Sequence, residues 1–189
     1  QSSPPQAAAT ATASESDAAD PEAKVAVCAG CHGPQGNSVV PENPILAGQS
    51  AQYLSSALQS YSEGDRQHGI MRTMARRLSA QDTEEITAYY ADQPPARSER
   101  RVRGDAAAGE GKTATCAGCH GPGGHSAIPG NPSLAGQHAE YLTRALKAYQ
   151  DGTRSNPMMT SLAASLSEQD IEDIAAYYAT QPSTPDTES

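Results

Sequence analysis

The strongest constraint on this chain is a five-residue motif, Cys-Ala-Gly-Cys-His, which occurs at residues 28–32 and again at residues 116–120. The chain contains four cysteines, and all of them lie in these two copies. No cysteine is left for a structural disulfide elsewhere, so each pair serves the chemistry of its own motif. Any fold of this chain must therefore bring two thiols and an imidazole together at two separate places.

The motif has the spacing of covalent haem attachment. Two thiols about one helical turn apart can each add to one vinyl group of a porphyrin, and the adjacent imidazole can then ligate the iron. A zinc site shared by the two pairs is disfavoured, because paired motifs of that kind are separated by only about 15–20 residues. A thioredoxin-like redox pair needs a βαβ context, which the sequence does not show. We therefore predict two covalently bound haem c groups. The predicted attachment residues are Cys28, Cys31, His32, Cys116, Cys119 and His120.

An offset of 88 residues aligns the two halves of the chain without a gap. It places residues 46–49 (Leu-Ala-Gly-Gln) on 134–137, and residues 88–91 (Ala-Tyr-Tyr-Ala) on 176–179. This similarity indicates duplication of one small unit. The predicted organisation is a flexible N-terminal tail over 1–16, a first domain over 17–95, a basic linker over 96–104, a second domain over 105–183 and a C-terminal tail over 184–189.

Helical periodicity dominates both units, so we expect an all-α fold. A first helix should end near Gly33, and a second should follow Gln49 and end at Gly64. Ser79 should cap a last helix that stops before Pro94, with Ser167 and Pro182 in the same roles in the second unit. Loops are expected over 33–47 and 121–135, which are rich in Gly, Pro, Asn and Ser.

The repeat also selects candidates for the sixth iron ligand. Of the four methionines, Met71 maps onto Met159, whereas Met74 maps onto Leu162 and Met158 onto Ile70. Equivalent haems should have equivalent ligands, so Met71 and Met159 are the predicted thioether ligands. Met74 and Met158 are expected to be packing residues, because their counterparts are aliphatic.

Further candidates support the haem or are excluded by the same register. Pro44 and Pro132, each twelve residues after its histidine, could offer a carbonyl to the second ring nitrogen. Tyr53 and Tyr141 could bind propionates or pack in the core. The remaining histidines map onto Asn156, Asn37 and Ser50 and are expected on the surface. They are His68, His125 and His138.

The charge of the chain limits its partners. The formal net charge is −9, which argues against nucleic acid and favours docking on basic protein surfaces. The linker over 96–104 holds four arginines and one glutamate, which could neutralise propionates or remain solvated. No apolar run approaches the roughly 18 residues that span a bilayer.

At this point the chain resembles class I cytochromes c, and more closely the dihaem cytochrome c4 family. The resemblance rests on four patterns that each occur twice: C-A-G-C-H-G, N-P-x-L-A-G-Q, a methionine seven residues before L-S-x-Q-D, and A-Y-Y-A. It implies two cytochrome c folds related by an approximate twofold, with haems facing one another through their propionate edges. It also implies that the Pro44 and Pro132 carbonyls bind the proximal histidines.

The resemblance implies periplasmic electron transfer, from a quinol-oxidising complex towards a terminal oxidase. We expect a monomeric electron carrier rather than an enzyme, with peripheral membrane association left open. One alternative is a haem subunit of a larger oxidoreductase, such as a flavocytochrome c or another dehydrogenase. The other is a ligand sensor or peroxidase-like protein, against which the paired methionines argue.

Overall fold

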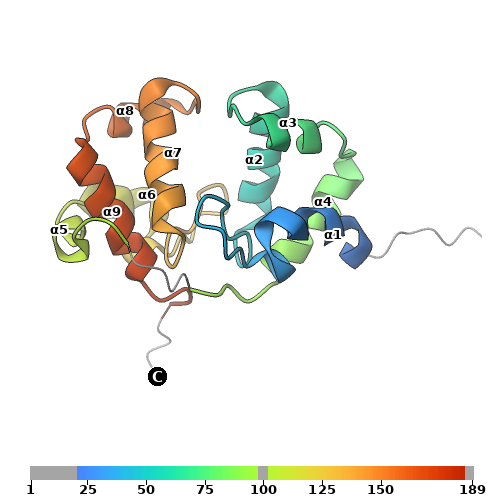
Figure 1. Ribbon diagram of the computed structural model, residues 1–189, viewed down its shortest axis with the longest axis horizontal. Helices are drawn as coiled ribbons and strands as arrows, with labels where there is room; N and C mark the ends of the chain where they lie inside the picture. Colours follow the sequence, from blue (N-terminus) through green and yellow to red (C-terminus); the bar gives the residue numbers. More distant parts are fainter. Residues whose placement is uncertain (1–20, 98–101, 186–189) are drawn as a thin grey trace, which may run out of the picture.

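The computed structural model describes residues 21–97 and 102–185, which form two helical domains (Figure 1). Within these ranges the chain forms α-helices and two short 3-10 turns, with no β-strand. Domain 1 contains α1 (Pro21–His32), η1 (Pro34–Gly36), α2 (Ala51–Glu63), α3 (Gly69–Ala75) and α4 (Ala80–Ala91). Domain 2 contains α5 (Ala106–Glu110), α6 (Ala114–His120), η2 (Pro122–Gly124), α7 (Ala139–Asp151), α8 (Pro157–Ala163) and α9 (Glu168–Thr180). The all-α prediction is confirmed.

The helix ends follow local chemistry. Ser79 accepts a hydrogen bond from the backbone N–H of Asp82, and the Asp82 carboxylate accepts one in return, which closes a capping box at the start of α4. Ser167 and Asp170 do the same for α9. Gly64, at φ 104°, ends α2 in the left-handed conformation that favours glycine.

Two features of the helices were not predicted. Helices α3 and α8 have seven residues each, which is too short for a periodic signal. Domain 2 also divides its first helix into α5 and α6, whereas α1 is continuous. The predicted tail over 1–16 lies outside the described residues, as do parts of the linker and of the C-terminal tail. No helix among the described residues is long and apolar enough to cross a membrane.

Each domain core is built around one buried tyrosine. Tyr90 packs with Val25, Leu54 and Ile86, and Tyr178 occupies the equivalent place in domain 2. Gly36, at φ 78°, lies against the Tyr90 ring, where an added Cβ would stand 2.7 Å from Cδ1. The loop between the motif helix and α2 therefore packs directly on the last helix of the domain.

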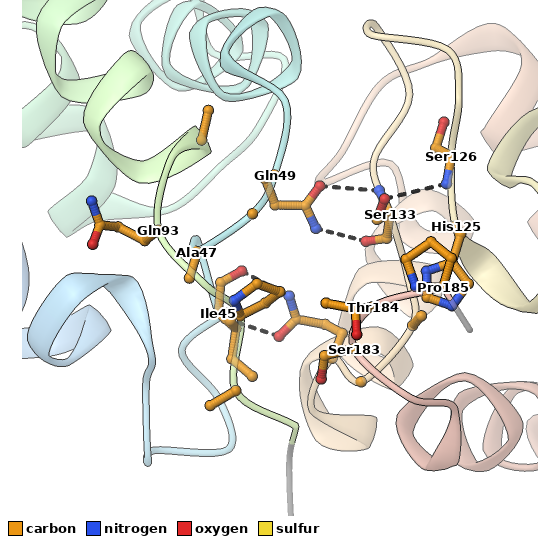
Figure 2. Close-up of a pocket in the computed structure, with 17 residues that line it drawn as sticks. Ile45, Ala47, Gln49, Gln93, His125, Ser126, Ser133, Ser183, Thr184 and Pro185 are labelled. Carbon is orange, nitrogen blue, oxygen red and sulfur yellow. Dashed lines mark hydrogen bonds between the residues drawn. The ribbon is translucent and has the colours of Figure 1, made fainter. Parts of the chain in front are cut away.

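Two glutamines join the domains by the same pair of hydrogen bonds (Figure 2). The Gln49 side chain donates to the carbonyl of Ser133 (2.6 Å) and accepts from its N–H (3.0 Å). Gln137, at the equivalent position, makes both bonds to Ile45 at 2.9 Å. Ile45 and Ser133 are themselves equivalent by the 88-residue offset, so the contact is symmetric. The duplicated motif thus holds the two copies together.

The expectation of a surface position is wrong for His138, which is only 2 % exposed. Its Nε2 lies 2.8 Å from the carbonyl oxygen of Ser38 in domain 1 and must donate to it, because a carbonyl only accepts. The equivalent Ser50 hydroxyl donates to the carbonyl of Pro129. This position therefore needs a donor across the interface, which either side chain supplies. His68 is exposed, as expected, and His125 is half-buried in a cavity between the domains.

Candidate haem sites

Each Cys-x-x-Cys-His motif lies at the end of a helix. Cys28 and Cys31 stand one turn apart on α1, and Cys116 and Cys119 do so on α6; none of the four forms a disulfide. In each pair the first cysteine is half-buried and the second is exposed. Both motif histidines are buried, each 7 % exposed. The helical spacing thus presents two thiols on one side of the helix, as attachment to two vinyl groups requires.

The ring of each motif histidine is oriented by a proline carbonyl. His32 Nδ1 lies 3.0 Å from the oxygen of Pro44, and His120 Nδ1 lies 2.9 Å from that of Pro132. Because a carbonyl only accepts, Nδ1 carries the hydrogen and Nε2 keeps its lone pair. Burial lowers the pKa of both imidazoles. Each ring therefore favours the neutral form, with the nitrogen that binds metal available.

Two asparagines hold the proline loops in place. Asn43 Nδ2 donates to the carbonyl of Cys31 at 2.8 Å, and Asn131 does the same to Cys119 at 2.9 Å. Each bond ties the residue before the proline to the motif helix itself. The repeated Asn-Pro pair was visible in the sequence, but its role as a brace depends on the folded loop.

The predicted methionine ligands are placed at equivalent points of α3 and α8. Met71 and Met159 are half-buried, and their N–H groups are capped by His68 Nδ1 (3.3 Å) and Asn156 Oδ1 (3.1 Å). Burial is the main cause of the lowered pKa of His32, and the charge of His68 at the start of α3 lowers that pKa further. The packing expectation is wrong for Met158, which is 62 % exposed. On the short helix α8, Ala163 is fully buried, whereas Met158 lies on the solvent-exposed side.

Tyr53 and Tyr141 lie in a cationic cluster between the domains. The segments after α2 and α7 pair by backbone hydrogen bonds, from Gln67 N–H to Thr153 (2.8 Å) and from Ser155 N–H to Asp65 (2.7 Å). This places Arg66 opposite Arg154 in an antiparallel bridge. Sequence reasoning did not single out either arginine, because the contact joins segments 88 residues apart.

The side chains of this cluster carry positive charge without a matching carboxylate. Arg66 is 8 % exposed, donates to the Tyr53 hydroxyl (3.0 Å) and lies 5.5 Å from the Tyr61 ring centre. Burial opposes ionisation of Tyr53, but the positive charges of Arg66 and Arg154 outweigh it and lower the pKa of Tyr53. No described carboxylate forms an ion pair with either arginine. The cluster is thus suited to anionic groups.

The residues present fit a haem in each domain. The buried Nε of Arg154 has no hydrogen-bond partner among the described residues, which suits a propionate oxygen. The described residues contain no group of three His, Cys, Asp or Glu placed to hold a metal ion, so the zinc alternative lacks a ligand set there. A porphyrin would offer two vinyl groups for the thiols and two propionates for the guanidinium groups.

Comparisons with known proteins agree with this geometry. The family model for cytochrome c matches residues 22–92 and 106–181. Cytochrome c4 of Pseudomonas aeruginosa is 41 % identical over 176 residues, covering 85 % of this chain and 87 % of that protein.

Solved structures give the same result. The crystal structure of reduced cytochrome c4 from Pseudomonas stutzeri superposes with a TM-score of 0.76 at 34 % identity, covering 86 % of this chain and 97 % of that one. Thiosulfate dehydrogenase (TsdBA) from Marichromatium purpuratum gives a TM-score of 0.77 at 35 % identity, covering 82 % of this chain but 36 % of that chain. The chain belongs to the cytochrome c4 family and is a dihaem electron-transfer protein with one covalently bound haem c in each domain.

Proposed function

We propose that this protein is a periplasmic electron carrier in which each iron has one histidine and one methionine ligand. The observation that carries the proposal is the repeated His–Pro geometry, since both domains fix a neutral imidazole in the same way. Met71 and Met159 are the proposed sixth ligands. Bound haem would supply one reversible electron at each iron, and ligation by Met71 and Met159 would leave no open position for a substrate at the metal.

The surrounding residues favour electron transfer over a reaction of a substrate at the iron. The Pro44 and Pro132 carbonyls hold the imidazoles in one orientation, so little reorganises when an electron arrives. Arg66 and Arg154, with Tyr53 and Tyr141, are the proposed propionate-binding residues and would offset the negative charge of two haems at the domain boundary. The paired glutamines join the two domains by hydrogen bonds, and this would keep the distance between the two haems constant.

Carbon monoxide tests the filled coordination sphere directly. The reduced holoprotein should bind carbon monoxide slowly and in low yield at neutral pH, because the thioether must first leave the iron. Met71→Ala should open one site and admit one equivalent. Rapid binding of two equivalents by the unmodified protein would point instead to a ligand sensor or a peroxidase-like protein.

We propose the partners as a quinol-oxidising donor complex and a terminal oxidase, with the carrier acting as a monomer, peripheral to the membrane at most. A second candidate is an electron acceptor built into or bound by a dehydrogenase. It is favoured by the match to the thiosulfate dehydrogenase from Marichromatium purpuratum, which covers most of this chain. A flavocytochrome c subunit belongs to the same class.

Turnover with a purified thiosulfate dehydrogenase separates the two candidates. A dedicated acceptor would be reduced by enzyme and thiosulfate at a rate that saturates at micromolar carrier, and would elute with the enzyme on gel filtration. A free carrier should elute separately from the enzyme. Its reduction should be slow, and the rate should not saturate with carrier concentration. A quinol-oxidising complex from native membranes is the comparison donor, and it should reduce the free carrier faster than the thiosulfate dehydrogenase does.

A further inference from the structure

The short helix that carries Met71 is basic, whereas the equivalent helix in domain 2 is uncharged. Three exposed arginines lie on α3 and the two residues after it, and the 88-residue offset replaces all of them by neutral residues on α8. The arginines are Arg72, Arg76 and Arg77, and their counterparts are Thr160, Ala164 and Ser165. The two domains therefore differ at the surface nearest the proposed sixth ligand.

These arginines are not used by the fold as ion-pair partners. No described carboxylate lies within ion-pair distance of them, whereas Lys24 in the same domain binds both Asp82 and Glu85. Arg76 donates only to the carbonyl of Ser62, at 3.2 Å. Arg72 and Arg76 are one helical turn apart, where like charges repel. A chain of net charge −9 thus carries three arginines between residues 72 and 77 that have no ion-pair partner among the described residues.

An exposed aliphatic side chain lies on the same short helix as the arginines. Ile70 is 64 % exposed and immediately precedes Met71 on α3. Transient interfaces combine charge, which steers the encounter, with an apolar contact, which excludes water. In Figure 1, α3 and α8 lie on opposite sides of the central helices α2 and α7, so one face can be covered while the other is open.

We propose that the α3 face, formed by Ile70, Arg72, Arg76 and Arg77, is the docking surface for an acidic redox protein, which exchanges electrons with the haem of domain 1. The inference deepens the proposed function, because it depends on Met71 being the ligand that places this face beside the haem. Net charge alone predicts a basic partner. The basic α3 face instead favours an acidic partner at that place, whereas the uncharged α8 face does not.

Reduction of the oxidised holoprotein by a reduced plant-type ferredoxin, an acidic redox protein, tests the proposal in stopped flow. The second-order rate constant should fall about ten-fold as ionic strength rises from about 10 mM to about 200 mM. The variant Arg72→Gln/Arg76→Gln/Arg77→Gln should lose about ten-fold at the lower ionic strength and respond little to salt. The variant Thr160→Arg/Ala164→Arg/Ser165→Arg should gain rate, because it builds the same surface on domain 2.

A variant of equal charge change controls for net charge. Arg97→Gln/Arg103→Gln/Arg144→Gln removes three exposed bases outside α3 and should change the rate less than two-fold. Equal slowing by both triple variants, or acceleration of the unmodified protein by salt, would overturn the proposal. Midpoint potentials and the methionine-to-iron charge-transfer band are recorded for every variant, so loss of docking is distinguished from loss of ligation.

Discussion

Gln49 and Gln137 occupy equivalent positions in the two domains, and each binds the N–H and the carbonyl of one residue in the opposite domain. Both side chains are buried. Each glutamine thus belongs to the loop of its own domain, but its side chain bonds to the backbone of the other domain. The interface is a consequence of duplication, because one surface pairs with a copy of itself.

Removing one of these glutamines should loosen the domain interface. Gln137→Ala leaves the buried N–H and carbonyl of Ile45 without partners, at a cost of about 2–4 kcal/mol. Urea unfolding of the holoprotein should show a lower midpoint and a broader or split transition. Gln93→Ala is the control, because that side chain bonds only to Tyr89 within its own domain. A loss in Gln93→Ala as large as in Gln137→Ala would contradict the interface role.

Replacement of the paired arginines should lower both haem potentials. Arg66→Gln and Arg154→Gln each remove a positive charge that favours the added electron, so both midpoints should fall by tens of millivolts in a spectroelectrochemical titration. Arg66→Lys keeps the charge but loses the planar fork, and its potential should stay closer to that of the unmodified protein. Unchanged potentials in both glutamine variants would exclude a role at the propionates.

Acid should destabilise domain 2 through Asp173. Its carboxylate accepts hydrogen bonds from the backbone N–H of Asp105 and from the side chains of Lys112 and Gln169. These bonds lower the pKa of Asp173 to about 2. A depressed folded-state pKa gives stability that is present above the unfolded value of about 3.9 and is lost as pH falls through about 2. Asp173→Asn should therefore lower the melting temperature at pH 7, and its difference from the unmodified protein should shrink as pH falls towards about 2.

Glu85→Gln is the matched control for this prediction, because Glu85 lies at the equivalent position of domain 1 and is more exposed. Its effect at pH 7 should be the smaller of the two. A pH-independent difference between Asp173→Asn and the unmodified protein would show that the carboxylate charge is not the cause.

Much of the fold could be predicted from local signals in the sequence. Capping at Ser79, the stop at Gly64 and the helical spacing of apolar residues were sufficient for the longer helices. The position of the acceptor carbonyl at Pro44 also agrees with the expected pairing to His32. What could not be predicted depends on contact between distant segments. Arg66 meets Arg154, and His138 meets Ser38, only because two folded domains pack against each other.

We propose that both irons have a histidine and a methionine ligand, with Met71 and Met159 as the methionines. The ferric holoprotein should show a Met-to-iron charge-transfer band, and its intensity tests the claim most directly. Met71→Ala and Met159→Ala should each remove about half of the band, and the double variant all of it, because the thioether is the electron donor of that transition. Met74→Ala and Met158→Ala should leave it intact. Retention of the full band in Met71→Ala, or its loss in Met74→Ala, would contradict the assignment.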